Sequence, residues 1–260
     1  PLFEYSQTAL NLVTIVGMIT AVFAASVALV QNDIKKIVAY STCSQLGYMF
    51  FAAGVGAYHV AMFHLFTHAF FKALLFLGSG SVIHAFKDEQ DIRNMGGVRK
   101  KLPYTYILML IGTLALTGFP FLSGFYSKDA IIEFAYLRNS SLGNYAATIG
   151  IFTAFLTSIY SWRLFFKTFH GSYNNKKIPI NEVHESPIII LAPLFFLGFG
   201  ALFAGYFFKE TFIGHHSNDF WKSSIFFLNE IKHDAIPLWF LLLTPILVAV
   251  SIPISFYYFI

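Results

Sequence analysis

Residues 64–76 read HLFTHAFFKALLF, and this stretch decides the class of protein. It lies inside an apolar run over 58–85. As a helix that run rises roughly 40 Å, more than the hydrocarbon core of a bilayer, which is about 30 Å thick. The chain is 57% hydrophobic and 12% charged, whereas soluble domains average about 25% charged residues. Further apolar runs cover 9–30, 37–56, 103–137, 145–168, 187–208 and 237–259. The sequence therefore predicts an all-α, polytopic transmembrane helix bundle of about seven spans.

The run over 103–137 is interrupted near its middle. The segment 117–128 reads TGFPFLSGFYSK, and two glycines and a proline there weaken backbone hydrogen bonding. Non-helical backbone at membrane depth is tolerated only where protein or water satisfies it. We therefore expect either one broken crossing or two short ones.

Loop charge decides between these two topologies. With one broken crossing, the basic clusters at Lys35–Lys36, between Lys87 and Lys101, and at Lys176–Lys177 all fall on one side of the membrane. The positive-inside rule favours this arrangement. The loop over 209–236, whose charges are mixed in sign, then lies on the opposite side.

His64, His68 and Lys72 are spaced four residues apart inside the run over 58–85. Steps of four turn a helix by only 40°, so the three side chains share one face. Lys72 lies near the centre of the span, where an ammonium group costs roughly 2.5–3.5 kcal/mol to insert. A partner, a water molecule or loss of the proton can offset this cost. The spacing favours a proton relay over the alternative, a static polar network that holds helices together.

Other polar residues extend this pattern. Ser44 and Gln45 share a face of the run over 37–56 with Ser41 and Tyr48, and either bond neighbouring helices or line a water-filled path. Lys128 and Asp129 follow the helix break, which makes Lys128 a candidate ion site and Asp129 a weaker one. Lys35 is a weaker candidate still, for proton uptake at the interface.

Several function classes are disfavoured. The basic residues lie in loops between apolar runs, so the net charge of +4 does not indicate nucleic-acid binding. The sequence has no P-loop, GxGxxG motif or metal-ligand pattern, so we expect no cofactor and no metal bound by this chain. The single cysteine cannot form an internal disulfide. Because the chain begins at Pro1, we expect it to be part of a longer protein.

At these residues the sequence resembles a known family. The segment from ALVQNDIKK at residue 28 to SVIHAF at residue 86 resembles the large antiporter-like subunits of respiratory complex I, of the subunit 5 or bacterial L type. MGGVRKKLP at 95–103, GFPFLSGFYSKDAII at 118–132 and SIYSWRLFFKTFHG at 158–171 do so as well. The resemblance covers roughly residues 20–171, and 172–260 match in hydropathy more than in motif.

The resemblance implies a fold and residue roles. The family builds a proton channel from two inverted helical repeats, each with a broken helix. Residues 1–170 would be the second repeat, with its break near 117–128, and 171–260 would be C-terminal transmembrane helices before a missing lateral helix. Lys72 matches the family's central lysine, His64 and His68 its neighbouring histidines, and Lys128 the lysine on the broken helix that releases protons.

The resemblance also implies partners. The chain would be a proton-translocating part of NADH:ubiquinone oxidoreductase, an enzyme complex whose NADH, FMN, iron–sulfur clusters and ubiquinone are bound by other subunits. It would assemble with other membrane-arm subunits and the missing N-terminal half, in a bacterial plasma membrane or a mitochondrial inner membrane. The alternatives are a subunit of an Mrp-type cation/proton antiporter or of a membrane-bound hydrogenase, and a non-conducting scaffold.

Overall fold

The computed structural model describes residues 3–226 and 236–260, and within them the fold is helical. The described residues contain no β-structure beyond an isolated bridge between Asp33 and Asp91. The helices are α1 Gln7–Val30, α2 Ile34–Gly54, α3 Tyr58–Ala85, α4 Pro103–Thr117, α5 Ser123–Leu137, α6 Ser141–Phe169, α7 Ile188–Phe212, α8 Ser217–Trp221 and α9 Leu238–Phe259, with single 3₁₀ turns at Ile92–Asn94 and Ile180–Glu182. The prediction of an all-α bundle is confirmed. The short helix α8 lies in a loop that has no apolar run and was not predicted.

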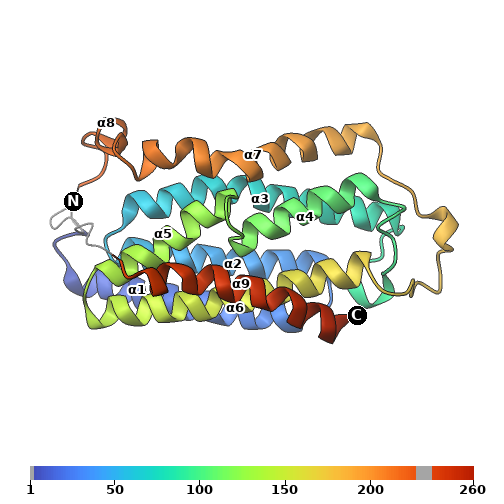
Figure 1. Ribbon diagram of the computed structural model, residues 1–260, viewed down its shortest axis with the longest axis horizontal. Coiled ribbons are helices and arrows are strands. Elements are labelled where there is room, and N and C mark those ends of the chain that lie inside the picture. The colour runs from blue at the N-terminus through green and yellow to red at the C-terminus, as the bar shows by residue number, and fades with distance from the viewer. Residues whose placement is uncertain (1–2, 227–235) are drawn as a thin grey trace.

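The long helices lie side by side along one axis and alternate in direction (Figure 1). Within the described parts of the chain, five helices are long and apolar enough to cross a membrane: α1, α3, α6, α7 and α9. α2 spans 21 residues but carries many polar side chains, and α4 and α5 have 15 residues each. α4 and α5 follow one another along the axis, which is the arrangement expected of one broken crossing.

The break between α4 and α5 is shorter than the sequence suggested. α4 ends at Thr117, where Gly118 adopts the left-handed conformation (φ +81°) typical of a C-terminal helix cap. α5 begins at Ser123, so the non-helical segment covers 118–122 and not 117–128. Lys128 therefore lies in the second turn of α5, inside the helix and not at its end. The two halves pack closely: a Cβ on Gly124 would lie 1.8 Å from the carbonyl oxygen of Ala115.

α1 and α2 form the closest helix pair. A Cβ on Gly17 would lie 2.4 Å from the backbone nitrogen of Phe51, and one on Gly47 would lie 2.6 Å from that of Ala21. Small residues allow helices in a membrane to approach until their backbones touch. This close contact packs one face of α2 against α1 and leaves its polar face, with Ser41 and Gln45, toward the interior.

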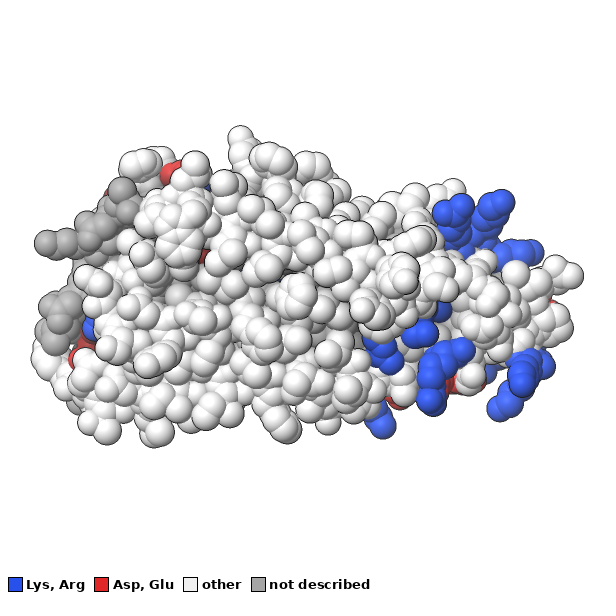
Figure 2. All heavy atoms as spheres, turned by 60° about the horizontal axis from the view of Figure 1, so that its bottom comes forward, with Lys and Arg blue, Asp and Glu red and all other residues white. Residues whose placement is uncertain are grey.

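The basic clusters lie at one end of the molecule, as the single broken crossing requires. Figure 2 shows Lys and Arg side chains gathered at this end, where α1–α2, α3–α4 and α6–α7 are connected. We call it the basic end. The loop after α7 lies at the other end; its residues 227–235, with Glu230, Lys232 and Asp234, fall outside the described residues.

Backbone hydrogen bonds join the connections at the basic end. Ile34 and Ile92 donate to the carbonyls of Gln90 and Asn32, at 2.9 Å each. Arg163 of α6 donates to the Gln31 carbonyl at 2.5 Å and to the Asn32 side chain at 2.6 Å, which satisfies the C-terminal end of α1. These contacts fix the positions of α2 and α3 along the bundle axis, and so the positions of their polar residues.

Candidate functional site

Three ionisable side chains of α3 point into the bundle. His64, His68 and Lys72 are 0%, 6% and 4% exposed. The ring centroids of the two histidines are 5.9 Å apart. The predicted shared face is therefore buried against other helices and not turned toward lipid.

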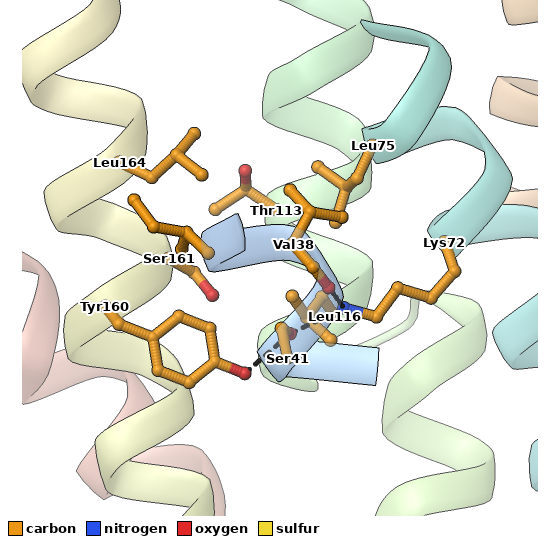
Figure 3. A pocket seen from close by; sticks show the side chains of 10 residues that line it. Val38, Ser41, Lys72, Leu75, Thr113, Leu116, Tyr160, Ser161 and Leu164 are labelled. Carbon is orange, nitrogen blue, oxygen red and sulfur yellow. Dashed lines mark hydrogen bonds between the residues drawn. The ribbon is translucent and has the colours of Figure 1, made fainter. Parts of the chain in front are cut away.

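The amine of Lys72 reaches α2 (Figure 3). It donates a hydrogen bond to Ser41 Oγ at 2.5 Å, and the carbonyl oxygen of Val38 lies 3.5 Å away. The Ser41 hydroxyl in turn lies 2.7 Å from the hydroxyl of Tyr160 on α6. A buried amine needs acceptors to remain charged, and here α2 supplies them.

A small cavity adjoins this amine. It measures about 10 Å³, close to the least that holds a water molecule. Thr113 and Leu116 of α4 and Ser161 and Leu164 of α6 line it beside Lys72, and among the described residues the Ser161 hydroxyl has no hydrogen-bond partner. Most of its lining residues lie between Lys72 and the basic end, so the cavity extends toward that end.

His64 joins three helices. Its Nε2 lies 3.1 Å from Oε1 of Gln45 on α2, and its Nδ1 lies 2.9 Å from the hydroxyl of Ser127 on α5. Ser127 is also 2.7 Å from the hydroxyl of Thr67. Because Ser127 directly precedes Lys128, His64 connects the face that carries Lys72 with the helix that carries the second lysine.

Lys128 is fully buried, yet its surroundings differ from those of Lys72. Its Nζ lies 5.2 Å from the centre of the Tyr48 ring, a cation–π contact. Among the described residues this nitrogen has no hydrogen-bond acceptor. The side chain passes close to Gly118, where a Cβ would lie 4.0 Å from its Cδ, so the helix break leaves room for it.

Asp129, the next residue, lines a cavity that Lys128 does not reach. It is 8% exposed, and neither carboxylate oxygen has a hydrogen-bond partner among the described residues. With Glu133, one turn later, it lines a cavity of about 340 Å³ between α5 and α7, toward the end opposite the basic loops. We call this the α5–α7 cavity. Asp129 therefore does not act as a simple capping residue at the start of a helix.

The structure brings most of the predicted site residues together, but not all of them. His64, His68, Lys72, Gln45, Lys128 and Asp129 lie in one buried region of α2, α3 and α5. Ser44 instead donates to the Ala21 carbonyl at 2.8 Å and serves the contact between α1 and α2. Lys35 is exposed in the first turn of α2, apart from the buried lysines.

Three contributors to the site were missed: Ser127, Thr67 and Tyr160. Single hydroxyl groups are common in membrane helices, and their spacing does not show which helix they meet. For Ser127 a signal was available, because it directly precedes Lys128. Within residues 3–226 and 236–260, no cluster of three or more metal-ligating side chains occurs.

The family is identified by sequence comparison. The sequence profile described as "NADH:quinone oxidoreductase/Mrp antiporter, TM" matches residues 1–157, more than half of the chain. The chain belongs to this family. It is an integral, multi-pass membrane protein, and the match includes every helix that forms the buried site, apart from the end of α6.

Similar proteins carry the name of a complex I subunit. The chain is 54% identical over 251 residues to NADH-ubiquinone oxidoreductase chain 5 of Phytophthora infestans, covering 95% of this chain and 38% of that protein. It is 53% identical over 237 residues to chain 5 of Marchantia polymorpha (90% and 35%) and 54% identical over 225 residues to NADH-quinone oxidoreductase subunit L of Rhodobacter capsulatus (82% and 31%). The chain thus spans about a third of the length of these relatives.

A solved structure shares the fold. The Mrp complex from Dietzia sp. DQ12-45-1b superposes with a TM-score of 0.71, over 96% of this chain and 28% of that one, at 24% sequence identity. At this identity the likeness shows the fold alone. It agrees with the antiporter-like architecture that the sequence predicts.

Proposed function

We propose that this chain forms a proton half-channel in the membrane arm of an NADH:quinone oxidoreductase, with Lys72, His64, His68 and Lys128 as the proton-carrying groups. The observation that carries the proposal is the buried series of polar groups from Lys72 to Lys128. Ser41 contacts Lys72, Gln45 contacts His64, and Ser127 joins His64 to the helix of Lys128. Burying so many polar groups at membrane depth is costly, and such groups mark ion pathways.

Protons enter this series from the basic end. The cavity beside Lys72 extends in that direction and has room for one water molecule, which the unpartnered Ser161 hydroxyl can bind. A water there carries a proton to the Lys72 amine. Leu75, Leu116 and Leu164 line the same cavity and limit access, so the path is narrow.

Transfer from Lys72 to Lys128 passes the histidines. A neutral imidazole donates at one ring nitrogen and accepts at the other, so it relays a proton by exchanging the two roles. Among the described residues Nε2 of His68, Nε2 of Gln45 and Nζ of Lys128 have no hydrogen-bond partner. Buried polar atoms without partners indicate places where water completes the relay.

The driving force is electrostatic. Two ammonium groups in one low-dielectric interior repel each other, so a proton arriving at Lys72 favours release from Lys128. Redox-linked changes in partner subunits alter this balance. NADH, FMN, iron–sulfur clusters and ubiquinone belong to those partners, and the N-terminal remainder of a chain 5-type subunit completes the channel.

The test replaces Lys72 in the assembled complex. In sealed membrane vesicles, Lys72→Met abolishes proton pumping by this half-channel, because methionine keeps the volume and carries no proton. Lys100→Met, an exposed lysine at the basic end, is the matched control and leaves pumping unchanged. Undiminished pumping by Lys72→Met at a normal oxidation rate would refute the relay.

The rival functions give different outcomes. A subunit of an Mrp-type antiporter moves sodium against protons without NADH oxidation, so sodium-dependent acidification in the same vesicles would favour it. Hydrogen-dependent proton transport would favour a hydrogenase. A scaffold predicts that pumping survives replacement of Lys72 and Lys128 together, while loss of the chain dissolves the complex.

A further inference from the structure

Lys209 occupies a position that the proposed relay does not use. It lies in the last turn of α7 and lines the α5–α7 cavity. It also lines a second, larger cavity of about 900 Å³ at the same end of the molecule, bordered by Glu210, Asn218 and Trp221. Lys209 therefore stands where the cavity facing Asp129 meets the larger one.

Glu133 lies between Asp129 and that junction. It follows Asp129 by one helical turn, so both carboxylates share one face of α5 and line the α5–α7 cavity. Asp129 has no hydrogen-bond partner there among the described residues, although it is more than nine-tenths buried. Asp129 Oδ1 and Lys128 Cδ both come near Gly118, 3.9 and 4.0 Å from where a Cβ there would lie. Water at the helix break can therefore carry a proton from Lys128 to the unpartnered Asp129 carboxylate, which passes it on to Glu133.

We propose that Glu133 is the last proton acceptor before the outer solution and that Lys209 gates proton release from it. This inference rests on the proposed relay and adds its exit step. The ammonium group of Lys209 stabilises the Glu133 carboxylate, so Glu133 gives up its proton once the proton arrives. The same positive charge opposes the return of protons from the outside.

The other charged groups around Glu133 lie elsewhere. On α5 itself, Lys128 and Asp129 precede Glu133 and lie deeper in the bundle. Arg138 caps the C-terminal end of the helix. α7 contributes Glu210 beside Lys209, and His59 of α3 lines only the larger cavity. Arg163 and Lys167 of α6, like Lys35 and Lys36 of α2, lie at the basic end. Lys209 is thus the cationic residue of the described chain that lines the same cavity as both carboxylates.

The experiment uses the assembled complex in sealed vesicles with three variants. Lys209→Gln removes the charge, Lys209→Arg keeps it, and Lys222→Gln is the matched control, because Lys222 lines the larger cavity but not the α5–α7 cavity. We expect Lys209→Gln to slow coupled pumping by up to about fivefold, the effect of losing one partly screened charge pair. Lys209→Arg and Lys222→Gln keep the normal rate, and raising the outer pH restores the rate of Lys209→Gln.

A double variant tests the pairing. In a Glu133→Gln background, Lys209→Gln causes no further slowing, because the two residues act on one step. Equal slowing in both backgrounds, or a Lys209→Gln rate equal to that of Lys222→Gln, would overturn the gate. Rescue by sodium instead of outer pH would overturn it in favour of a metal-cation site. Normal pumping by Lys72→Met would refute the relay itself. Loss of pumping in Lys72→Met together with a normal pumping rate in Lys209→Gln would refute the gate alone.

Discussion

The two buried lysines have opposite surroundings. The amine of Lys72 meets the Ser41 hydroxyl at 2.5 Å and lies near the Val38 carbonyl, with Tyr160 behind Ser41. The amine of Lys128 lies 5.2 Å from the centre of the Tyr48 ring and has no hydrogen-bond acceptor among the described residues. Hydrogen-bond acceptors stabilise an ammonium group in a buried site, and their lack disfavours it. Lys72 therefore has acceptors for an ammonium group that Lys128 lacks, which separates the two lysines in the proposed relay.

One helix sets this difference. α2 presents Ser41, Gln45 and Tyr48 at intervals of four and three residues, and each meets a different basic side chain. The hydroxyl of Ser41 and the amide oxygen of Gln45 are hydrogen-bond acceptors, whereas Tyr48 offers Lys128 only a ring face. These three contacts follow one another along α2 away from the basic end, which is the direction of the proposed proton movement.

Arginine substitutions at the two lysines should have the largest effect on pumping. They also test most directly whether the surroundings of Lys72 and Lys128 differ. Arginine cannot lose its proton, so Lys72→Arg and Lys128→Arg both stop pumping. The two arginine variants should differ in how much complex assembles. At position 72 the guanidinium finds Ser41 and the Val38 carbonyl. At position 128 the described residues offer no acceptor where the present amine lies, and each unsatisfied N–H group costs about 1–3 kcal/mol. We expect less assembled complex in membranes for Lys128→Arg, measured by native gel electrophoresis, with the methionine variants as size controls.

Equal amounts of the two arginine variants would contradict the comparison. They would mean that water supplies acceptors around Lys128 as effectively as α2 does around Lys72. The difference in acceptors between the two lysines would then have no effect on which of them tolerates a permanent charge.

Loss of the Ser41 hydroxyl should have an intermediate effect. Ser41→Ala leaves Lys72 with only the distant Val38 carbonyl, and a hydrogen bond to a charged group contributes about 1.5–3 kcal/mol. We expect turnover to fall about tenfold and the alkaline limb of the pH–activity profile to move to lower pH, because the ammonium form is less stabilised. Ser44→Ala is the matched control, since that hydroxyl bonds the Ala21 carbonyl and not a lysine. A shift of the same size in Ser44→Ala would assign the effect to helix packing.

These contacts also show how far sequence reasoning reaches. Helix positions follow from apolar runs, and the shared face of His64, His68 and Lys72 follows from a spacing of four, so both could be predicted. The partner of each residue could not, because periodicity fixes a face but not the neighbour it meets. Ser44 and Gln45 are adjacent in sequence, yet one contacts α1 and the other His64. The predicted break over 117–128 is too long for a similar reason. In the sequence Gly124 indicates interrupted backbone hydrogen bonding, whereas in the structure it lies inside α5 and allows close approach to Ala115.

Changes at Tyr48 should have the smallest effect on pumping. They test whether the aromatic ring stabilises the ammonium form of Lys128. Tyr48→Phe keeps the ring over Lys128 but loses the hydroxyl that donates to the Gly150 carbonyl at 2.5 Å. Tyr48→Leu removes the ring and with it a cation–π contact of about 0.5–2 kcal/mol. Both lose the Gly150 hydrogen bond, so a difference between them at equal assembly reports loss of the ring, including its packing. We expect a several-fold lower pumping rate for Tyr48→Leu than for Tyr48→Phe at equal assembly, because without the ring Lys128 rarely accepts a proton. If the two variants pump equally, the ring does not stabilise the Lys128 ammonium, and proton transfer to Lys128 depends on water and Asp129 alone.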